Sequence, residues 1–364
     1  MRVCLLIAAV FATPALGADW PVFRGNSAMT GVGSPKLPDQ LEERWVFQTK
    51  VKDTIEGAPA VVDGVVYFAS MDRHLYAVDL KTGKEIWSVR LAPMKASPAV
   101  RAGRIYVGDV EGKFYCLEAK TGQLVWSFET SGEIIAGANF HKERILIGSH
   151  DSTLYCLEAD GKKAWELKID GPVNGAAVVI GDRTFVAGCD SNLHVVDVLT
   201  GKSLGMVDLG GQAAATAAVV DDRVYVGTMS NTVIAVDWKK QKKAWEFEAP
   251  KRQQPFYASA AVTDQLVIAG SRDKKVYAID RATGKERWNF LTEGSVDASP
   301  VVVGNRIYVG CLSDTGEFYV LDLATGKEIQ KLEFYSAITG SVAVGPDCLI
   351  VGTEKGTLHC LGKK

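Results

Sequence analysis

The chain has 364 residues, of which 47% are hydrophobic, and its 41 Lys and Arg against 43 Asp and Glu give a formal net charge of −2. A chain of this length and composition can bury a large core, while its near-neutral charge lacks the basic field that nucleic-acid binding requires. We therefore predict a globular protein without a nucleic-acid partner.

The first 18 residues have the features of a secretory signal peptide. Arg2 precedes an apolar run over residues 3–11, and small residues follow at 14–18. We expect cleavage near Gly17 or Ala18, so that the mature protein is periplasmic or secreted. The apolar run is too short for a membrane-spanning helix, no later stretch approaches the required ~20 apolar residues, and no Cys follows as a lipid acceptor. We therefore expect neither a transmembrane segment nor a lipid anchor.

Residues 19–40 form an irregular leader in this interpretation, because Gly and Pro interrupt them repeatedly. Residues 41–47 then have the pattern of a strand. A single domain is predicted over residues 41–364.

The first complete repeat predicts four short strands. Asp63 and Gly64 separate the apolar runs 60–62 and 65–69, which is a strong signal for a β-hairpin. Two further strands, 75–78 and 85–89, flank the turn 79–83. In that turn the Asp and Thr side chains can bond local backbone, and Gly tolerates positive φ.

Edited copies of this unit recur along the chain about every 40 residues, an interval typical of propeller blades. The last strand of six units carries an aligned tryptophan: Trp45, Trp87, Trp126, Trp165, Trp245 and Trp288. Gly205 and Gln330 occupy the two remaining registers. We therefore predict an all-β, eight-bladed β-propeller of four-stranded antiparallel blades.

The two ends of the chain complement each other. Residues 340–344, 348–352 and 357–361 supply three strands of a final unit, and the chain then stops. Residues 41–47 have no preceding strands of their own. We predict that this N-terminal strand completes the last blade, because an open ring would leave an unpaired strand edge.

Six cysteines follow the signal segment, and none is adjacent to another. Most of them fall at repeat positions that carry small residues in other units. We therefore expect buried free thiols that behave as small hydrophobic side chains. The histidines show no spacing typical of a metal site, so no metal is predicted. His194 and His359 occupy the position of Tyr76 and are interpreted as packing substitutes.

Strand order places the loops between second and third strands on the same face as the connections between units. We predict that a partner binds this face, since it varies from unit to unit. Arginine and aromatic residues are enriched at binding hot spots, which favours Arg73, Arg252, Tyr257 and Arg272. The same rim is expected to carry further charged residues of both signs and two histidines: Lys52, Asp53, Glu56, Asp72, His74, Lys95, Asp109, Glu111, His150, Asp151, Asp190, Asp273, Lys274, Asp297, Asp314, Glu354 and Lys355. The alternative is a solvated rim of mixed charge that keeps the disc soluble. No catalytic residues are predicted.

The repeat resembles a known family. Residues 75–87 and 276–288 contain Leu-Tyr-Ala-Val-Asp or its variant, Thr-Gly-Lys-Glu and a Trp, and are similar to the pyrroloquinoline-quinone-type propeller repeat. Residues 19–26 are also similar to the segment that precedes this propeller in many secreted proteins. The resemblance implies an eight-bladed disc in which each Trp packs on the turn of a neighbouring blade, at Gly83, Gly122, Gly284 and Gly326.

Two functional branches of the family give different expectations. Quinoprotein alcohol dehydrogenases hold pyrroloquinoline quinone and calcium over the central funnel, many with adjacent cysteines against the quinone. This chain has no adjacent cysteines and little beyond its repeats. It is more similar to the BamB-like, non-catalytic branch, although it lacks the lipid-acceptor cysteine. We expect a scaffold that binds a protein or polymer without a cofactor, for example in cell-envelope or outer-membrane protein assembly; a quinone-dependent dehydrogenase is the alternative.

Overall fold

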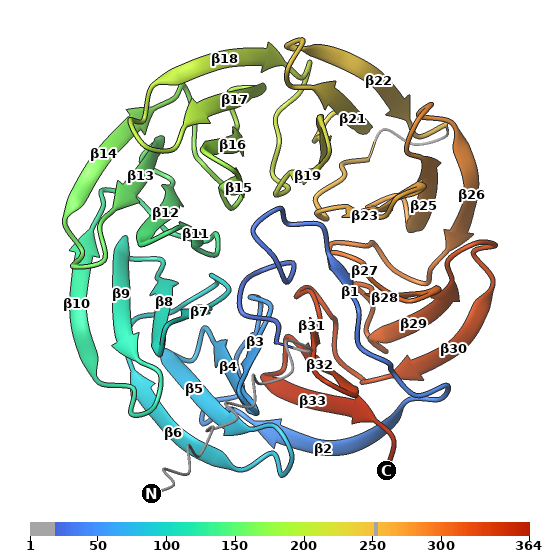
Figure 1. Ribbon diagram of the computed structural model, residues 1–364. Helices are drawn as coiled ribbons and strands as arrows, with labels where there is room; N and C mark the ends of the chain where they lie inside the picture. Colours follow the sequence, from blue (N-terminus) through green and yellow to red (C-terminus); the bar gives the residue numbers. More distant parts are fainter. Residues whose placement is uncertain (1–18, 251–253) are drawn as a thin grey trace, which may run out of the picture.

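The computed structural model describes residues 19–250 and 254–364, which form eight antiparallel sheets arranged around a central axis (Figure 1). No helix occurs in this described part of the chain. The predicted eight-bladed propeller is therefore confirmed. The signal segment and Arg252 lie outside the described residues.

The blades are numbered in chain order, and each is given from its innermost to its outermost strand. Blade 1 has β3 (Ala60–Val62), β4 (Val65–Ala69), β5 (His74–Asp79) and β6 (Glu85–Arg90). Blade 2 has β7 (Ala99–Arg101), β8 (Arg104–Gly108), β9 (Lys113–Glu118) and β10 (Leu124–Glu129). Blade 3 has β11 (Asn139–His141), β12 (Arg144–Ser149), β13 (Thr153–Leu157) and β14 (Lys163–Lys168). Blade 4 has β15 (Val178–Ile180), β16 (Arg183–Ala187), β17 (Asn192–Asp197) and β18 (Ser203–Asp208).

The second half of the ring follows the same order. Blade 5 has β19 (Ala218–Val220), β20 (Arg223–Gly227), β21 (Thr232–Asp237) and β22 (Lys242–Glu248). Blade 6 has β23 (Ala261–Val262), β24 (Leu266–Ser271), β25 (Lys275–Asp280) and β26 (Glu286–Leu291). Blade 7 has β27 (Val301–Val303), β28 (Arg306–Gly310), β29 (Glu317–Asp322) and β30 (Glu328–Glu333), with the short β1 (Val32–Gly33) beside β27. Blade 8 has β31 (Ala343–Val344), β32 (Cys348–Gly352), β33 (Thr357–Gly362) and β2 (Glu42–Gln48).

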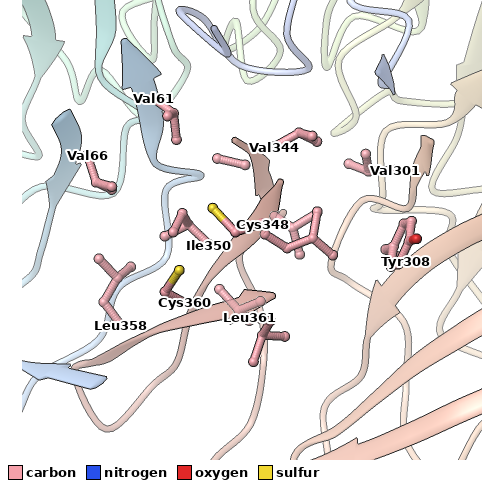
Figure 2. Close-up of a cluster of buried hydrophobic side chains, with 14 of the residues drawn as sticks. Val61, Val66, Val301, Tyr308, Val344, Cys348, Ile350, Leu358, Cys360 and Leu361 are labelled. Atoms are coloured by element: carbon pink, nitrogen blue, oxygen red, sulfur yellow. The ribbon is translucent and has the colours of Figure 1, made fainter. Parts of the chain in front are cut away.

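The ring is closed by the N-terminal strand, as predicted. Strand β2 pairs antiparallel with β33, with Trp45 opposite Cys360. Buried side chains from blades 1, 7 and 8 form one cluster across the closure, including Val61, Tyr308 and Ile350 (Figure 2). The joint between the two chain ends is therefore part of a continuous hydrophobic core.

The leader was expected to be irregular, but it is extensively bonded to the propeller. Its backbone carbonyls accept hydrogen bonds from the inner strands of six blades, through the amides of Val61, Val100, Val179, Val219, Val262 and Val302. Strand β1 pairs in parallel with β27. The leader thus lies across the centre of the disc (Figure 1) and pairs the inner strand edges that would otherwise face an open channel.

The disc has two faces. The turn face carries the turns between third and fourth strands, together with the hairpins between first and second strands. The loop face carries the loops between second and third strands and the connections from one blade to the next.

Tryptophan and glycine meet between blades on the side of the turns. The Trp45 indole covers Gly83 so closely that a Cβ there would lie 2.6 Å from the ring, and its Nε1 donates to the Leu80 carbonyl at 2.9 Å. The other pairs of this kind are Trp87 with Gly122, Trp126 with Gly161, Trp165 with Gly201, Trp245 with Gly284, and Trp288 with Gly326. Each such contact joins one blade to the next.

Glutamine holds the two interfaces without tryptophan. Between blades 4 and 5, Gln241 fills the space over Gly205 and donates to the Leu204 carbonyl at 2.9 Å. Between blades 7 and 8, Gln330 bonds both the amide and the carbonyl of Leu41, at 2.9 and 2.8 Å. The missing tryptophans are therefore replaced by polar contacts.

Candidate functional site

A cavity of about 160 Å³ lies at the centre of the disc and is lined by residues that precede the inner strands. Phe23 of the leader is among its lining residues. The blades contribute to it from two equivalent positions, which form two rings of side chains. The two rings differ in how closely their residues follow the repeat.

The first ring consists mostly of hydroxyl groups and links neighbouring blades. The Ser97 hydroxyl accepts the Ala58 amide at 2.9 Å, and the Ser299 hydroxyl accepts the Ser259 amide at 2.9 Å. The five members of this hydroxyl belt are Ser97, Thr216, Ser259, Ser299 and Ser341. All of them are buried. The belt therefore has a structural role in joining blades.

The second ring lies two residues earlier in each blade and varies in chemistry. Its members are Glu56, Lys95, Ile135, Asn174, Ala214, Tyr257, Asp297 and Thr339. The ring thus combines acid, base, amide, aromatic and aliphatic groups. A surface with such varied groups can discriminate between partners, which a uniform ring cannot.

The strongest polar contacts of this ring involve Arg272, from the loop between β24 and β25. Its guanidinium bonds the Asp297 carboxylate with Nη2 to Oδ2 at 2.6 Å and Nε to Oδ1 at 2.9 Å. The same guanidinium lies 4.0 Å from the centroid of the Tyr257 ring. These hydrogen bonds to Asp297 raise the pKa of Arg272. We call Tyr257, Arg272 and Asp297 the Arg272 cluster.

The Arg272 cluster is oriented but remains accessible. The side chain of Arg272 is 40% exposed, whereas that of Asp297 is 15% exposed. Across the ring, the Lys95 ammonium lies 4.0 Å from the Glu56 carboxylate. Burial raises the pKa of Glu56, and the carboxylates of Glu354, Asp297 and Glu133 add to this effect.

The structure brings together two of the residues predicted from the sequence. Tyr257 and Arg272 are in direct contact. Arg73 is not among the residues that line the cavity; it forms an exposed ion pair with Glu111 at 3.7 Å. Sequence reasoning did not single out the pairing of Arg272 with Asp297 or the hydroxyl belt. Alignment of the residues just before each inner strand would have shown the belt.

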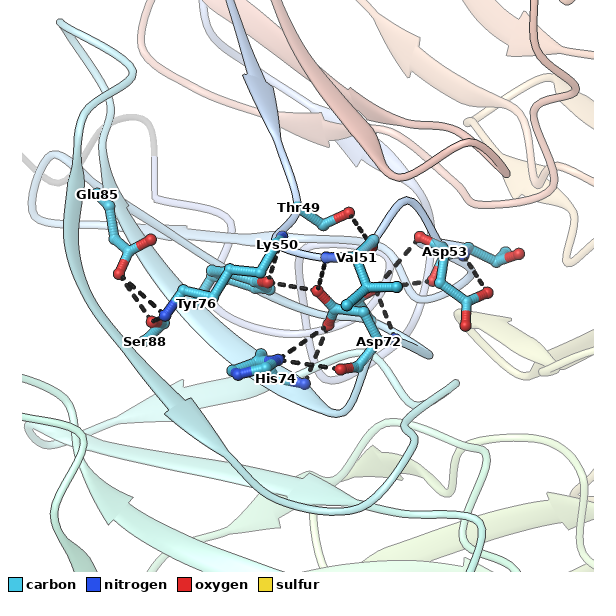
Figure 3. Close-up of polar contacts among 11 residues, drawn as sticks. Thr49, Lys50, Val51, Asp53, Asp72, His74, Tyr76, Glu85 and Ser88 are labelled. Carbon is cyan, nitrogen blue, oxygen red and sulfur yellow. Dashed lines mark hydrogen bonds and ion pairs between the residues drawn. The ribbon is translucent and has the colours of Figure 1, made fainter.

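Three predicted rim carboxylates are instead buried structural groups, and that expectation was wrong. Asp72 is 5% exposed and accepts hydrogen bonds from the Tyr76 hydroxyl and the His74 amide (Figure 3). Asp109 likewise accepts the Tyr115 hydroxyl at 2.7 Å, and Asp273 accepts that of Tyr277. The loops turn these carboxylates inward because a tyrosine from the third strand of the blade reaches them.

The histidines at the Tyr76 position make similar contacts. His194 bonds the Asp190 carboxylate at 2.6 Å. His359 bonds Glu43 at 2.7 Å and Thr357 at 2.9 Å. Both side chains are buried, as expected for packing substitutes.

Five of the six cysteines are buried and Cys189 is partly exposed, and all six are unpaired in the described chain. Burial raises the pKa of Cys116 to about 11, which keeps this thiol protonated at neutral pH. Residues 19–250 and 254–364 contain no group of three or more His, Cys, Asp or Glu side chains placed to hold a metal. The same ranges contain no helix with the length and apolarity needed to cross a bilayer.

The cavity residues do not fit pyrroloquinoline quinone, a planar molecule with three carboxylates. Three carboxylates would need several unpaired cations around them, but Lys95 lies beside Glu56 and Arg272 is paired with Asp297. One face of the Tyr257 ring is covered by Arg272.

Solved structures with this architecture include proteins of different function. BamB from Moraxella catarrhalis superposes with a TM-score of 0.75 at 20% identity, covering 89% of this chain and 98% of the other. The quinohemoprotein alcohol dehydrogenase from Comamonas testosteroni gives 0.80 at 14% identity, covering 95% and 81%. A computationally designed protein, Ika8, gives 0.74 at 16% identity, covering 87% and 98%. At these identities the likeness establishes the fold alone.

Sequence similarity to curated proteins is local. The dehydrogenase subunit of a quinone-type alcohol dehydrogenase from Gluconobacter oxydans (strain 621H) is 34% identical over 82 residues, or 21% of this chain. The corresponding subunit from Gluconacetobacter polyoxogenes is 33% identical over the same length. In both cases the match spans 10% of the relative.

A family profile, in contrast, matches nearly the whole chain. Its overlapping matches cover residues 13–97, 39–172, 74–206 and 150–364. The profile is described as outer membrane protein assembly factor BamB. Together with the eight-bladed architecture, these matches show that the chain belongs to the BamB family of propeller proteins.

Proposed function

We propose that this protein is a non-catalytic scaffold of the cell envelope that binds a protein partner on its loop face. The observation that carries the proposal is the variation of the ring containing Tyr257 and Asp297, at positions that are structurally equivalent in every blade. The turn face and the hydroxyl belt keep the repeat because they join blades. Greater variation at the ring that faces the cavity mouth is expected where a specific surface is selected.

The Arg272 cluster is suited to anchor such a partner. Arginine and tyrosine are enriched at the centres of protein interfaces. Asp297 and Tyr257 hold the guanidinium in one orientation, so less side-chain entropy is lost when a partner docks. The Arg272 side chain is 40% exposed, and its guanidinium can donate further hydrogen bonds.

The family description supports a place in outer-membrane protein assembly. We therefore propose a periplasmic location after removal of the predicted signal peptide. The partner would be another envelope protein, bound through a surface patch or an extended segment.

Site-specific photocrosslinking can test the proposed face. A benzoylphenylalanine at position 335, where Tyr335 is 67% exposed on the blade 7 to blade 8 connection, would report the loop face. The same probe at the exposed Lys327 would report the turn face. We expect a discrete adduct in envelope extract only from position 335, competed by excess unlabelled protein. Equal adducts from position 327 would contradict the proposal.

A quinone-dependent dehydrogenase is the second candidate, favoured by the local similarity to quinone-type alcohol dehydrogenases. The test is incubation of the purified protein with pyrroloquinoline quinone and calcium, followed by desalting and absorbance measurement. We expect the quinone to be lost on desalting. Stoichiometric retention together with alcohol oxidation would replace the scaffold function with this one.

A further inference from the structure

The hydroxyl belt has donor capacity that the protein does not use. A hydroxyl group has one proton to donate as well as lone pairs that accept. Each of the five belt oxygens accepts a backbone amide from the preceding blade. Over residues 19–250 and 254–364, none of them donates to a protein acceptor within hydrogen-bond distance.

These hydroxyl groups all line the same central cavity. The five side chains are between 4% and 6% exposed. Thr339, which lines the same cavity, has a buried Oγ1 without any hydrogen-bond partner in the described structure. Buried polar groups are normally paired, so these hydroxyl protons are available to an acceptor that enters the cavity.

The charged side chains at the cavity occur as ion pairs, so they do not by themselves exclude an anion as that acceptor. The carboxylates of Glu56 and Asp297 line the cavity, but Lys95 and Arg272 neutralise them. Arg24, next to the lining residue Phe23, adds a further positive charge and is 1% exposed.

Arg24 has no carboxylate partner. Its Nη2 donates to the Pro300 carbonyl at 2.6 Å, and Pro300 directly follows Ser299 of the belt. The remaining nitrogens, Nε and Nη1, are buried without partners in the described structure. An isolated buried cation is strongly unfavourable unless an opposite charge lies nearby. Arg24 does not line the cavity and would act on it through its electrostatic field.

We propose that the central cavity binds a small oxyanion, of carboxylate or phosphate size, through the free protons of the hydroxyl belt. The cavity of about 160 Å³ suits an anion of this size. An oxyanion offers several lone pairs to converging hydroxyl donors, which neither a metal cation nor an aliphatic ligand does. This ligand is distinct from the macromolecular partner, and its binding can be measured on the purified protein alone.

The test compares thermal unfolding in chloride, phosphate and acetate at equal pH and ionic strength. We expect phosphate or acetate to raise the Tm above its value in chloride, with saturation as the anion is titrated. Stronger stabilisation by phosphate would assign a phosphate-type ligand, and stronger stabilisation by acetate a carboxylate. No stabilisation by either anion relative to chloride would overturn the proposal.

Variants separate anion binding from blade joining. The double variant Ser299→Ala/Ser341→Ala loses two blade-joining hydrogen bonds, so its Tm should fall in all three salts. The apparent affinity for the anion, obtained from the dependence of the Tm on anion concentration, should fall at least tenfold. Thr228→Ala removes a buried hydroxyl elsewhere, one that bonds Thr232 at 2.6 Å, and should retain the full shift. If the double variant does not fold, isothermal titration of Arg24→Met gives an independent measurement. An unchanged anion affinity in the double variant or in Arg24→Met would contradict the assignment.

Discussion

The two faces of the disc are built from the same repeat but preserve it to different degrees. On the turn face, the Asp79 carboxylate accepts the Thr82 amide at 2.8 Å, and Asp322 accepts that of Thr325 at 2.8 Å. Hydrogen bonds from the Thr82 and Thr325 hydroxyl groups, and secondly from their amides, lower the pKa of these carboxylates. On the loop face, equivalent positions carry Glu56, Ile135 or Tyr257. Most positions that join blades keep their chemistry, with tryptophan–glycine contacts at six of the eight interfaces, whereas positions that face the cavity mouth do not.

The largest effect should come from removing the segment that closes the ring. Deletion of residues 19–49 removes β2 and the leader, leaves β33 with an unpaired edge and exposes the blade 8 core. We expect a loss of at least about 5 kcal/mol of unfolding free energy, comparable to the total stability of many domains. The measurements are urea unfolding and size-exclusion chromatography. Deletion of residues 19–31 alone, which keeps β2, should be less damaging. Normal melting and a monomeric profile for the longer deletion would contradict closure.

Turn-face tryptophans should matter for stability but not for partner binding. Trp87→Ala removes the packing on Gly122 and the hydrogen bond to the Ala119 carbonyl at 3.1 Å. We expect a loss of about 3 kcal/mol, as for other large aromatic truncations. Chemical denaturation measures the loss, and crosslinking from position 335 checks that binding persists. A loss below about 1 kcal/mol would show that the indole contact is dispensable.

The interface between blades 4 and 5 allows a reciprocal test of the same contact. Gly205→Trp alone should destabilise, because the new indole would collide with Gln241. The double variant Gly205→Trp/Gln241→Gly would give this interface the tryptophan–glycine contact that six other interfaces have. We expect a favourable coupling of about 1–2 kcal/mol between the two substitutions, determined by a double-mutant cycle. Simple additivity would argue that tryptophan and glycine do not act as a unit.

A smaller, pH-dependent effect is expected at His359. Burial lowers the pKa of this histidine below its ordinary value, and the bond to Glu43 only partly offsets this. The unfolded chain then binds more protons than the folded one as pH falls below about 6.5, so stability decreases on acidification. His359→Gln should reduce this decrease by under about 1 kcal/mol between pH 7 and pH 5. A pH dependence identical to that of the unmodified protein would rule out this contribution.

The repeat made much of the fold predictable. The register of Trp45 predicted closure, and the hairpin at Asp63 and Gly64 predicted strands β3 and β4 with their observed bounds. The contacts of the leader were not predictable in this way, because they use backbone carbonyls that every residue carries.

The site was less predictable than the fold. Asp72 was predicted on the rim because it lies in a loop between the second and third strands, yet Arg73 adopts a φ of 73° and the loop turns Asp72 toward Tyr76. The pairing of Arg272 with Asp297 joins two loops that are 25 residues apart. Sequence alone does not give the relative orientation of such loops.

The measurement that tests the functional account most directly is partner capture after charge reversal on each face. Arg272→Glu should weaken capture by about 5- to 150-fold, equivalent to 1–3 kcal/mol for a hot-spot residue. Its unfolding free energy should fall by about 1–3 kcal/mol, because Asp297 is only 15% exposed and loses its partner, so capture is measured at a temperature where the variant remains folded. The matched control, Lys84→Glu/Lys327→Glu, reverses exposed turn-face charges and should leave capture unchanged. Equal loss of capture in the control, or full capture by Arg272→Glu, would contradict binding through the loop face.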